Sequence, residues 1–269
     1  MHRRRSSLVP LVALSVAACA DLTPDNSTAP SSGAARVRVV HVSPTAPAVT
    51  VTRGGASLAQ GAAFAAVAPA TGYASTPAGP AVLEITGAGG GPAVFRAPIF
   101  LARDSAYTIV ALGNVGAGFA AGSARSFQPI VLRDTVATPA TGAWLRLLHA
   151  VDSVGVTTAT PPALTSAVDL FVYPQGTPRP AAAPAAGTAI RLLNISFRAQ
   201  TGYLPLTTPG TYVVEVFRAG VVPATSTPLV ATTVALTNGT KATVIVRAPQ
   251  AGATTAPLNA AGLVVLPEN

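Results

Sequence analysis

The sequence predicts an all-β protein in which two tandem antiparallel β-sandwich domains, Ig-like or transthyretin-like, follow a signal peptide and a flexible tether. Three observations support this fold class. Runs of roughly four to eight residues rich in Val, Ile, Thr and Tyr are separated by Gly, Pro and Asn at about ten-residue spacing, which is typical of a β-sandwich. The same series of motifs occurs twice. No segment after the signal peptide has helical periodicity.

Residues 1–18 are predicted to be the signal peptide of a bacterial lipoprotein. Consecutive arginines at positions 3–5 precede an apolar run that is too short to span a bilayer, which takes about 20 residues. A motif that resembles a lipobox ends this run and consists of Val16, Ala17, Ala18 and Cys19, the only cysteine in the chain. The thiol would take the lipid, and the small neighbours would admit the peptidase. An ordinary cleaved signal with an incidental cysteine is the alternative, and general secretion is favoured over the twin-arginine route.

Residues 19–35 are predicted to be the acylated cysteine and a disordered tether. The segment is rich in Pro, Ser, Thr and Ala without apolar periodicity, so as a flexible coil it would reach roughly 20–25 Å. Several acyl chains hold a protein on a membrane far more firmly than one does. Ala20 rather than Asp follows the cysteine, which fits export onward to an outer membrane. We therefore expect an exported protein, lipid-anchored to the cell envelope at the outer membrane or cell surface rather than the inner membrane.

The composition excludes several kinds of partner and bond. Loss of the three signal-peptide arginines lowers the formal charge from +8 to +5. The other arginines are spread along the chain instead of clustering on one element, so no nucleic-acid partner is expected. A chain with one cysteine has no intrachain disulfide. With 49% apolar and 10% charged residues, the domains must be stabilised by packing.

An internal repeat divides the rest of the chain into two units, residues 36–135 and 143–269, joined by a linker at 136–142. In this repeat, "RVRVVHV" recurs as "WLRLLHA", and "ATGYASTPAGPAVLEI" recurs as "QTGYLPLTTPGTYVVEV". Likewise, "LARDSAYTIVALG" and "FQPIVLRD" match "LTNGTKATVIVRA" and "AAGLVVLPE". We expect a structural role for the side chains that the repeat makes equivalent, namely Arg38 and Arg146, His41 and His149, Tyr73 and Tyr203, and Glu84 and Glu215.

The motifs of the first unit resemble a known family. The stretch "RVRVVHVSPTAPAVTV", followed by "TGY", a Pro/Gly turn, "VLEI" and "AYTIVALG", is similar to the domain-of-unknown-function family DUF4397 of exported bacterial and archaeal proteins, which often occurs in tandem. The resemblance covers nearly all of residues 36–267 and is looser in the second unit. Family members carry acidic residues where Thr45 and Thr50 stand, and the second unit keeps Asp169 opposite Thr50. The resemblance implies the fold and the location, and it implies no activity, cofactor or catalytic residue.

The two equivalent histidines are the first candidates for a site. His41 is in phase with Val37 and Val39, and His149 has the same phase in its own unit. A histidine at the end of an inward strand face is expected to be a buried neutral ring bonded to backbone in the adjoining turn. The alternative is a metal ligand or a general base. Because a zinc site needs three or four ligands and neither unit has a second histidine or any cysteine, no metal site is expected.

The equivalent arginines are predicted to lie on the strand face opposite the histidines, toward solvent. There, Arg38 and Arg146 would pair across neighbouring strands with Glu84 and Glu215. Surface ion pairs of this kind are worth at most about 1 kcal/mol. An anion-binding arginine is the functional alternative.

The tyrosines and the glycine-rich runs complete the candidates. Tyr73 and Tyr203 follow Thr-Gly and precede a Pro-Gly turn, so we expect them to plug the sandwich end or lie on the surface, with sugar stacking as the alternative. The runs at 87–92 and 113–122 have phosphate-loop-like spacings but lack the following helix or Lys that would hold a phosphate. They are predicted to be hairpin loops that carry variable contacts. Without a nucleophile elbow or paired carboxylates, no catalytic residue and no cofactor are expected.

We therefore predict a non-enzymatic, lipid-anchored envelope protein that presents two domains for binding or adhesion. Its expected partners are the membrane, through the lipid anchor, and a carbohydrate or an envelope or surface protein. One alternative is a structural component of the envelope that contacts other proteins by strand addition. The other is an enzyme with scattered residues, which would show a cleft with a perturbed histidine or acid in one unit alone.

Overall fold

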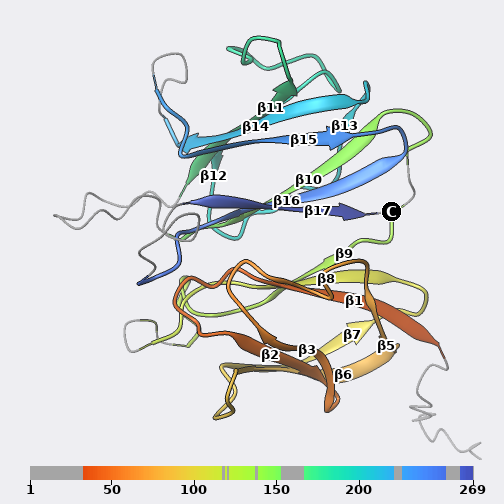
Figure 1. The fold of residues 1–269 in the computed structure, drawn as a ribbon, viewed down its shortest axis with the longest axis vertical. Helices are drawn as coiled ribbons and strands as arrows, with labels where there is room; N and C mark the ends of the chain where they lie inside the picture. The colour runs from red at the N-terminus through yellow and green to blue at the C-terminus, as the bar shows by residue number, and fades with distance from the viewer. Residues whose placement is uncertain are drawn as a thin grey trace, which may run out of the picture.

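The computed structural model describes residues 33–116, 119, 121–136, 139–152, 167–220, 226–252 and 261–268. Within these ranges the chain is all-β, as the sequence predicts, and consists of strands and their connecting loops (Figure 1). No helix in the same ranges is long and apolar enough to cross a membrane.

The strands form two groups, which we call the first unit and the second unit. The first unit contains β1 (Ala34–His41), β2 (Val49–Arg53), β3 (Ala56–Ala62), β4 (Val67–Ala68), β5 (Ala74–Pro77), β6 (Gly79–Gly87), β7 (Phe95–Leu101), β8 (Ala106–Ala111) and β9 (Ile130–Arg133). The second unit contains β10 (Ala143–Ala150), β11 (Val168–Pro174), β12 (Ile190–Ile195), β13 (Leu204–Leu206), β14 (Gly210–Arg218), β15 (Val230–Leu236), β16 (Thr240–Arg247) and β17 (Gly262–Glu268).

Each unit has two sheets. In the first unit the strand orders are β4-β1-β8-β9, with β5 also paired to β1, and β3-β2-β6-β7. In the second unit the orders are β13-β10-β16-β17 and β12-β11-β14-β15. These orders correspond to those of the first unit, with β13 in the place of β5, since β5 follows Tyr73 and β13 follows Tyr203; no described strand of the second unit corresponds to β4. We call the sheets that contain β1 and β10 the inner sheets, and those that contain β2 and β11 the outer sheets.

One strand pair in each inner sheet departs from the antiparallel arrangement that the sequence predicts. β1 pairs with β8, and β10 pairs with β16, in parallel register. The chain between the paired strands passes through the outer sheet and returns, so it re-enters the inner sheet in its original direction. The other pairs of described strands are antiparallel, and each unit is sandwich-like.

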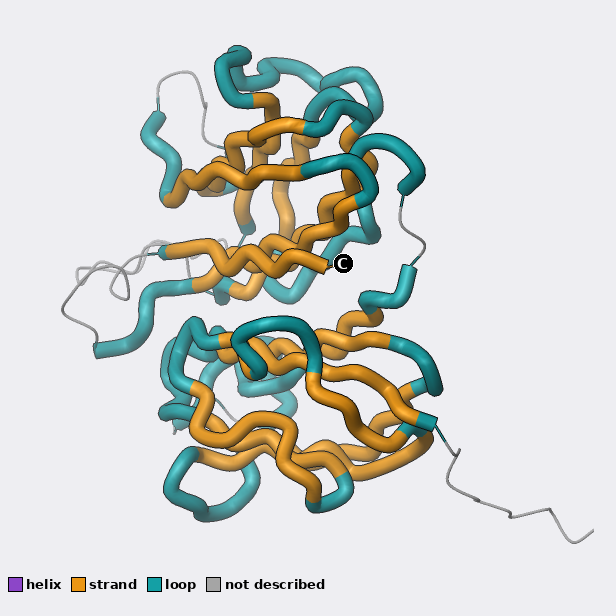
Figure 2. The backbone as a smooth tube through the Cα atoms, turned by 45° about the vertical axis from the view of Figure 1, so that its right-hand side comes forward, coloured by secondary structure: helices purple, strands orange, loops and turns teal. Residues whose placement is uncertain are grey.

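The four sheets are stacked as layers, with the two inner sheets facing each other (Figures 1 and 2). One apolar core, which includes Val37 and Ile85, fills the first unit, and another, which includes Leu145 and Val214, fills the second. A third apolar cluster combines residues of both units and consists of Val40, Val42, Val110, Leu112, Leu132, Leu148, Ala150, Ile245, Val264 and Leu266. The units are therefore joined by an apolar core of their own.

The burial of the strands follows from this layering. The inner strand β8, "AYTIVA", is buried at every position, and β16, "TKATVIVR", is buried at every position after the first. The outer strand β7, "FRAPIFL", alternates half-buried and exposed side chains along most of its length. Continuous burial is typical of strands covered on both faces, and alternation is typical of strands with one face in water. Each inner sheet thus lies between its own outer sheet and the other unit.

A β-bulge occurs at the same place in each outer sheet and is held by an equivalent side chain. In the second unit, Asp169 accepts hydrogen bonds from the backbone N–H groups of Asn194, at 2.7 Å, and Gly220, at 3.0 Å. In the first unit, Thr50 Oγ1 accepts one from Gly61 N–H at 3.2 Å. Asn194 and Gly61 have φ angles of 55° and 59°, in the left-handed region that Gly and Asn adopt most readily. The acidic residue at 169 therefore caps backbone groups.

The described chain begins and ends on the same side of the molecule (Figure 1). Arg38, in the middle of β1, bonds to Glu268 at the end of β17. The loops that follow β1 and β16 meet at the opposite end, where Ala251 N–H donates to the Pro44 carbonyl at 2.9 Å across the units. The described residues of these two loops thus lie at the end of the molecule away from Gly33, where the described chain begins.

Candidate functional site

A buried arginine of the first unit crosses to the second. On β1, Arg38 shares a face with Val40, and because the second unit covers this face, only 3% of Arg38 is exposed. Its guanidinium donates to Thr108 Oγ1 in its own unit at 2.7 Å. It also donates to Glu268 Oε1 at 3.0 Å and to the Pro267 carbonyl at 2.9 Å, both in the second unit. The guanidinium therefore bridges the two units.

Arg146 on β10 makes the corresponding contacts from the second unit. Its Nε donates to Thr243 Oγ1 in its own unit at 2.9 Å. Its Nη1 donates to the Arg133 carbonyl at 3.0 Å, and its Nη2 donates to Asp134 Oδ1 at 2.5 Å, both in the first unit. The same Nη2 lies 3.1 Å from Glu268 Oε1. Each arginine thus binds a threonine of its own inner sheet and a carboxylate of the other unit.

The two carboxylates are held in place by hydroxyl groups of their own units. In the first unit a threonine and a tyrosine donate to Asp134, and in the second unit the equivalent pair donates to Glu268. Both carboxylates are almost wholly buried. We call this set of side chains the interface network, and its members are Arg38, Tyr73, Thr108, Asp134, Arg146, Tyr203, Thr243 and Glu268.

The interface network contains two guanidinium groups and two carboxylates, so its formal charges balance. Charges are costly to bury unless ion pairs and hydrogen bonds compensate for the lost water. The nearby ammonium of Lys241 is also buried and donates to the carbonyls of Asp134, at 3.1 Å, and Val136, at 2.7 Å. A shift of one unit against the other would leave buried charges without partners. The network therefore favours this relative position of the units over others.

Each tyrosine of the interface network also stacks on the guanidinium of its own unit. The Arg38 guanidinium carbon lies 4.8 Å from the ring centroid of Tyr73, and that of Arg146 lies 4.7 Å from that of Tyr203. Burial, aided by the neighbouring carboxylate, raises the pKa of both phenols far above the usual value. Both hydroxyls therefore stay protonated and donate. Instead of plugging a sandwich end, the tyrosines lie half-buried beside the contact between the units.

The predicted pairing of the equivalent arginines with Glu84 and Glu215 is wrong. Glu84 pairs with Arg96 on the neighbouring outer strand, at 3.3 Å, and Glu215 pairs with Arg179. The two glutamates lie on outer sheets, whereas the arginines lie on inner sheets, so they are not on adjacent strands. The strand face that the sequence assigned to solvent is covered by the other unit.

Both histidines are buried, as predicted, and both bond to backbone. His41 Nε2 donates to the Pro47 carbonyl at 3.1 Å, and its Nδ1 lies 3.4 Å from the Ser43 N–H nitrogen. In the second unit the Val151 nitrogen lies 3.4 Å from His149 Nδ1. Burial lowers the pKa of His41 below its usual value, so this ring is neutral near pH 7. Each ring thus stabilises the turn that follows an inner strand.

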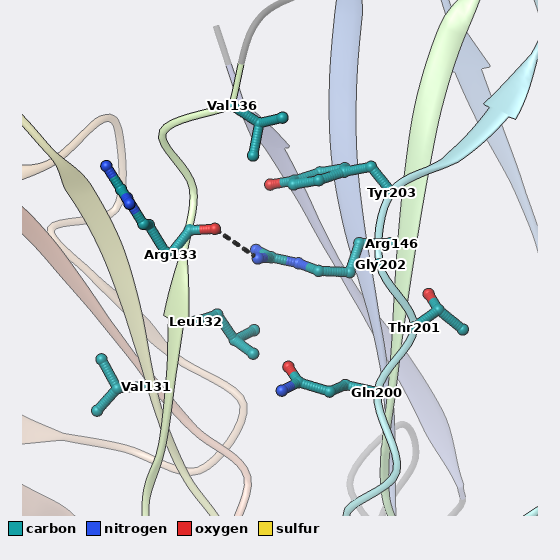
Figure 3. Close-up of a pocket in the computed structure, with 9 residues that line it drawn as sticks. All are labelled: Val131, Leu132, Arg133, Val136, Arg146, Gln200, Thr201, Gly202 and Tyr203. Atoms are coloured by element: carbon teal, nitrogen blue, oxygen red, sulfur yellow. Dashed lines mark hydrogen bonds between the residues drawn. The ribbon is translucent and has the colours of Figure 1, made fainter.

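A cleft of about 360 Å³ opens beside the interface network (Figure 3). One wall is formed by β9 and the residues after it, where Val131, Leu132 and Val136 are apolar, and the other by residues 200–203 of the second unit. The Arg146 side chain lies between the walls, and its bond to the backbone of β9 spans the gap (Figure 3). The cleft is therefore a feature of the contact between the units.

A second pocket, of about 420 Å³, lies at the loop end of the first unit. Phe95, Phe119 and Phe127 contribute aromatic rings to it, and Arg96 and Gln128 contribute polar groups. Its size and mixed lining are those of small-molecule sites. It includes described residues of the 113–122 loop, which the sequence marks as a contact surface.

The first unit and the strand that follows it carry a family signature. Residues 35–159 match DUF4397, a domain of unknown function. The DUF4397 match spans the first unit and β10, and it ends beyond the described residues of the next loop. Three charged members of the interface network, Arg38, Asp134 and Arg146, therefore lie inside the DUF4397 region. No curated protein sequence matches the chain.

The predicted lipidation site lies outside the described residues. The cysteine and its cleavage motif, Val16, Ala17, Ala18 and Cys19, belong to residues 1–32, so they stay predictions. In the part of the chain that the structure does describe, no group of three or more His, Cys, Asp or Glu side chains could hold a metal ion.

The two carboxylates of the interface network were not singled out from the sequence, although the repeat marks them. The aligned segments "FQPIVLRD" and "AAGLVVLPE" end in Asp134 and Glu268, so an acid stands at the same strand end in both units. Thr108 and Thr243 likewise share one position in the aligned strands before them. An acid and a hydroxyl that recur beside a recurring arginine were the available signal.

Proposed function

We propose that the chain is a lipid-anchored protein of the bacterial cell envelope that presents two tandem copies of one Ig-like or transthyretin-like domain for binding or adhesion to a carbohydrate or protein partner, without catalysing a reaction. Lipid on Cys19 would hold it to the membrane after removal of residues 1–18, and residues 20–33 would form the tether. The predicted tether is shorter at its end than the sequence indicated, because Ala34 and Ala35 pair with β5 as the first residues of β1. The repeated motifs, the corresponding strand orders and the matched halves of the interface network support two copies of one domain.

The main support for this proposal is that the ionisable side chains of the described residues bind to other groups within the fold. Among the described residues, every carboxylate has an ion-pair or hydrogen-bond partner in the chain. His41 and His149 are buried at the ends of β1 and β10. General acids, bases and nucleophiles must reach a substrate in a cleft, and no His, Asp or Glu lines either of the two cavities above. Carboxylates and histidines that are bonded within the fold stabilise it, which favours a binding scaffold.

The placement of the loops also supports presentation. A tether that joins the described chain at Gly33 approaches from the side opposite the end where Pro44 and Ala251 meet (Figure 1). The aromatic pocket around Phe95 and Phe127 lies at the loop end. Binding residues commonly lie on loops that a rigid scaffold positions. An anchored molecule would therefore hold this pocket away from the membrane.

Protease treatment of intact cells, followed by mass spectrometry, tests the proposal. We expect release of peptides from 36–269 without lysis, and metabolic labelling of the chain by fatty acid. Cys19→Ser should abolish the label and free the protein from the membrane, whereas the matched variant Ser31→Ala in the tether should change neither. Protection of both domains until lysis would exclude surface presentation, and a membrane-bound, labelled Cys19→Ser variant would exclude the anchor.

A structural role in the envelope through protein–protein contacts is the second candidate function. It is favoured by the edge strand β9, which borders the cleft between the units and pairs with another strand on one side only. Edge strands accept further strands through their unpaired backbone groups.

A further inference from the structure

The last strand of the first unit's inner sheet has a free hydrogen-bonding edge. β9 pairs with β8 on one side only. Because Asp134 N–H bonds to the Ala106 carbonyl at 2.8 Å, the backbone groups of Val131 and Arg133 point away from β8. The Arg133 carbonyl accepts from Arg146. Among the described residues, the N–H and C=O groups of Val131 and the N–H of Arg133 have no hydrogen-bond partner.

These free groups border the cleft shown in Figure 3. The Arg133 carbonyl reaches Arg146 in the cleft, and residues two apart on a strand direct their backbone groups to the same side (Figure 3). The opposite wall is also the edge of a sheet, since Thr201 N–H bonds to the Leu147 carbonyl of β10 at 2.9 Å. The cleft therefore lies between two sheet edges, and one of them has unused donors and acceptors.

The equivalent edge in the second unit is blocked by a proline. Pro267 on β17 corresponds to Arg133 on β9, because each precedes a carboxylate of the interface network and each carbonyl accepts from the other unit's arginine. Proline has no N–H group and is one of the devices that keep an edge strand from accepting another strand. β9 thus keeps a backbone donor that β17 lacks.

We propose that β9 binds an extended segment of a partner protein, which adds to the inner sheet as a further strand and lies in the cleft. This inference rests on the proposed function and names its partner as a polypeptide. In such complexes main-chain hydrogen bonds supply affinity, and side-chain contacts supply selectivity. Three main-chain groups of β9 are free for these bonds, and the cleft holds the added backbone between two walls.

The walls of the cleft define the chemistry of the segment. Val131, Leu132 and Val136 favour an apolar side chain. The exposed guanidinium of Arg133 points away from Arg146 (Figure 3) and donates to Ser105 Oγ at 3.3 Å, so it would meet a side chain on the outward face of an added strand. No acidic side chain is among the lining residues of the cleft. An incoming carboxylate would supply its missing counter-charge. The segment is therefore extended, free of proline where it pairs, and carries an apolar and an acidic residue.

Selection from a displayed library of linear seven-residue peptides on the full chain tests the inference. We expect enriched peptides that are extended, acidic and apolar, and that protect the amide protons of Val131 and Arg133 from exchange. Arg133→Pro removes one main-chain hydrogen bond and the guanidinium together, and it should weaken their binding by about tenfold. Arg133→Lys keeps the charge and the N–H, so its affinity should stay within about twofold. The proline already accommodated at position 267 makes Arg133→Pro a conservative change of backbone.

A second variant keeps the test decisive if Arg133→Pro fails to fold. The exposed Gln200 lies on the opposite wall, and Gln200→Trp should fill the cleft and weaken peptide binding without changing β9. Enriched peptides that bind all three variants equally, or a library that yields no binder, would overturn the inference. If the chain is acylated and exposed on cells but binds only glycans, the proposed function is supported and the peptide site at β9 is excluded. If the chain binds the peptides but is neither acylated nor exposed, the peptide site at β9 is supported and the lipid-anchored function is excluded.

Discussion

Replacement of Glu268 by glutamine tests whether the interface network holds the units together. Glu268 Oε1 accepts from Arg38 at 3.0 Å and from Arg146 at 3.1 Å, and two hydroxyl groups of its own unit bind the same carboxylate. Glutamine keeps the size and removes the charge, so two buried guanidinium groups would share one carboxylate. Since removal of one partner from a buried ion pair costs about 3–5 kcal/mol, we expect the free energy of unfolding to fall by that amount.

Thermal and urea unfolding of purified residues 20–269, followed by circular dichroism, measure this loss. For a chain of this size, 1 kcal/mol corresponds to about 2–4 °C, so the melting temperature should fall by about 6–20 °C. Glu84→Gln is the matched control. Its ion pair with Arg96 has side chains that are 38% and 68% exposed, so its loss should stay below about 1 kcal/mol. Adding Arg38→Gln to Glu268→Gln restores the charge balance and should recover part of the stability.

Equal losses for Glu268→Gln and Glu84→Gln would refute the reasoning, because burial of the charge would then make no difference. The double variant gives an independent check. If its loss equals the sum of the two single losses, then Arg38 and Glu268 contribute independently and the network is not a coupled unit.

Three further predictions concern other parts of the fold. Asp169→Ala removes the acceptor of two backbone N–H groups and should cost about 1–3 kcal/mol in urea unfolding, whereas a neutral result would mean that water replaces the carboxylate. Burial lowers the pKa of His41 below 6.5, so as the pH falls the histidine is protonated at a higher pH in the unfolded chain than in the folded one. The free energy of unfolding should therefore decrease below about pH 6.5, by at most about 1.4 kcal/mol per pH unit for this group. His41→Gln should flatten that decline, and an unchanged slope would contradict the assignment. Leu148→Ala, in the cluster between the units, should lower the free energy of unfolding by about 2–5 kcal/mol. Leu193 is 51% exposed, so Leu193→Ala should lower it by less than about 0.5 kcal/mol, and similar losses for the two variants would contradict the packing of the units.

The sequence sufficed to predict the strands and the role of the histidines. Period-two alternation is visible in "TYVVEVFR", where Tyr212, Val214 and Val216 meet the core. The other face of this strand is only partly in water, because Phe217 packs there against Phe171. His41 is in phase with the apolar residues of β1, and this phase correctly predicts a buried ring that bonds to the backbone of the adjoining turn. These features depend on neighbours within one unit, whose hydrophobic pattern the local sequence records.

The contact between the units could not be predicted in the same way. Arg38 alternates with Val37 and Val39, and in a strand with one wet face this pattern places an arginine in water. β1 is covered on both faces around Arg38, so the same arginine is buried. Val40 and Val42, on the arginine's face, were the evidence against solvent, since an exposed strand face rarely carries two consecutive apolar positions. Nothing in the sequence around Arg38 indicates that its partner lies in the other unit, and only the recurrence of an acid at Asp134 and Glu268 pointed to the carboxylates.

The apolar cluster and the interface network contribute different properties to the contact between the units. Apolar burial is non-directional, so the cluster alone would tolerate small shifts of one inner sheet over the other. The network is directional, because each unit supplies an arginine that needs the carboxylate of the other. In a separated unit these groups would be hydrated, and they form their bonds together only when the sheets meet in register. The relative position of the units is therefore fixed by charge and maintained by packing. The cleft depends on this position, since one wall comes from each unit, and a surface that recognises an extended segment must keep its two walls at a constant separation.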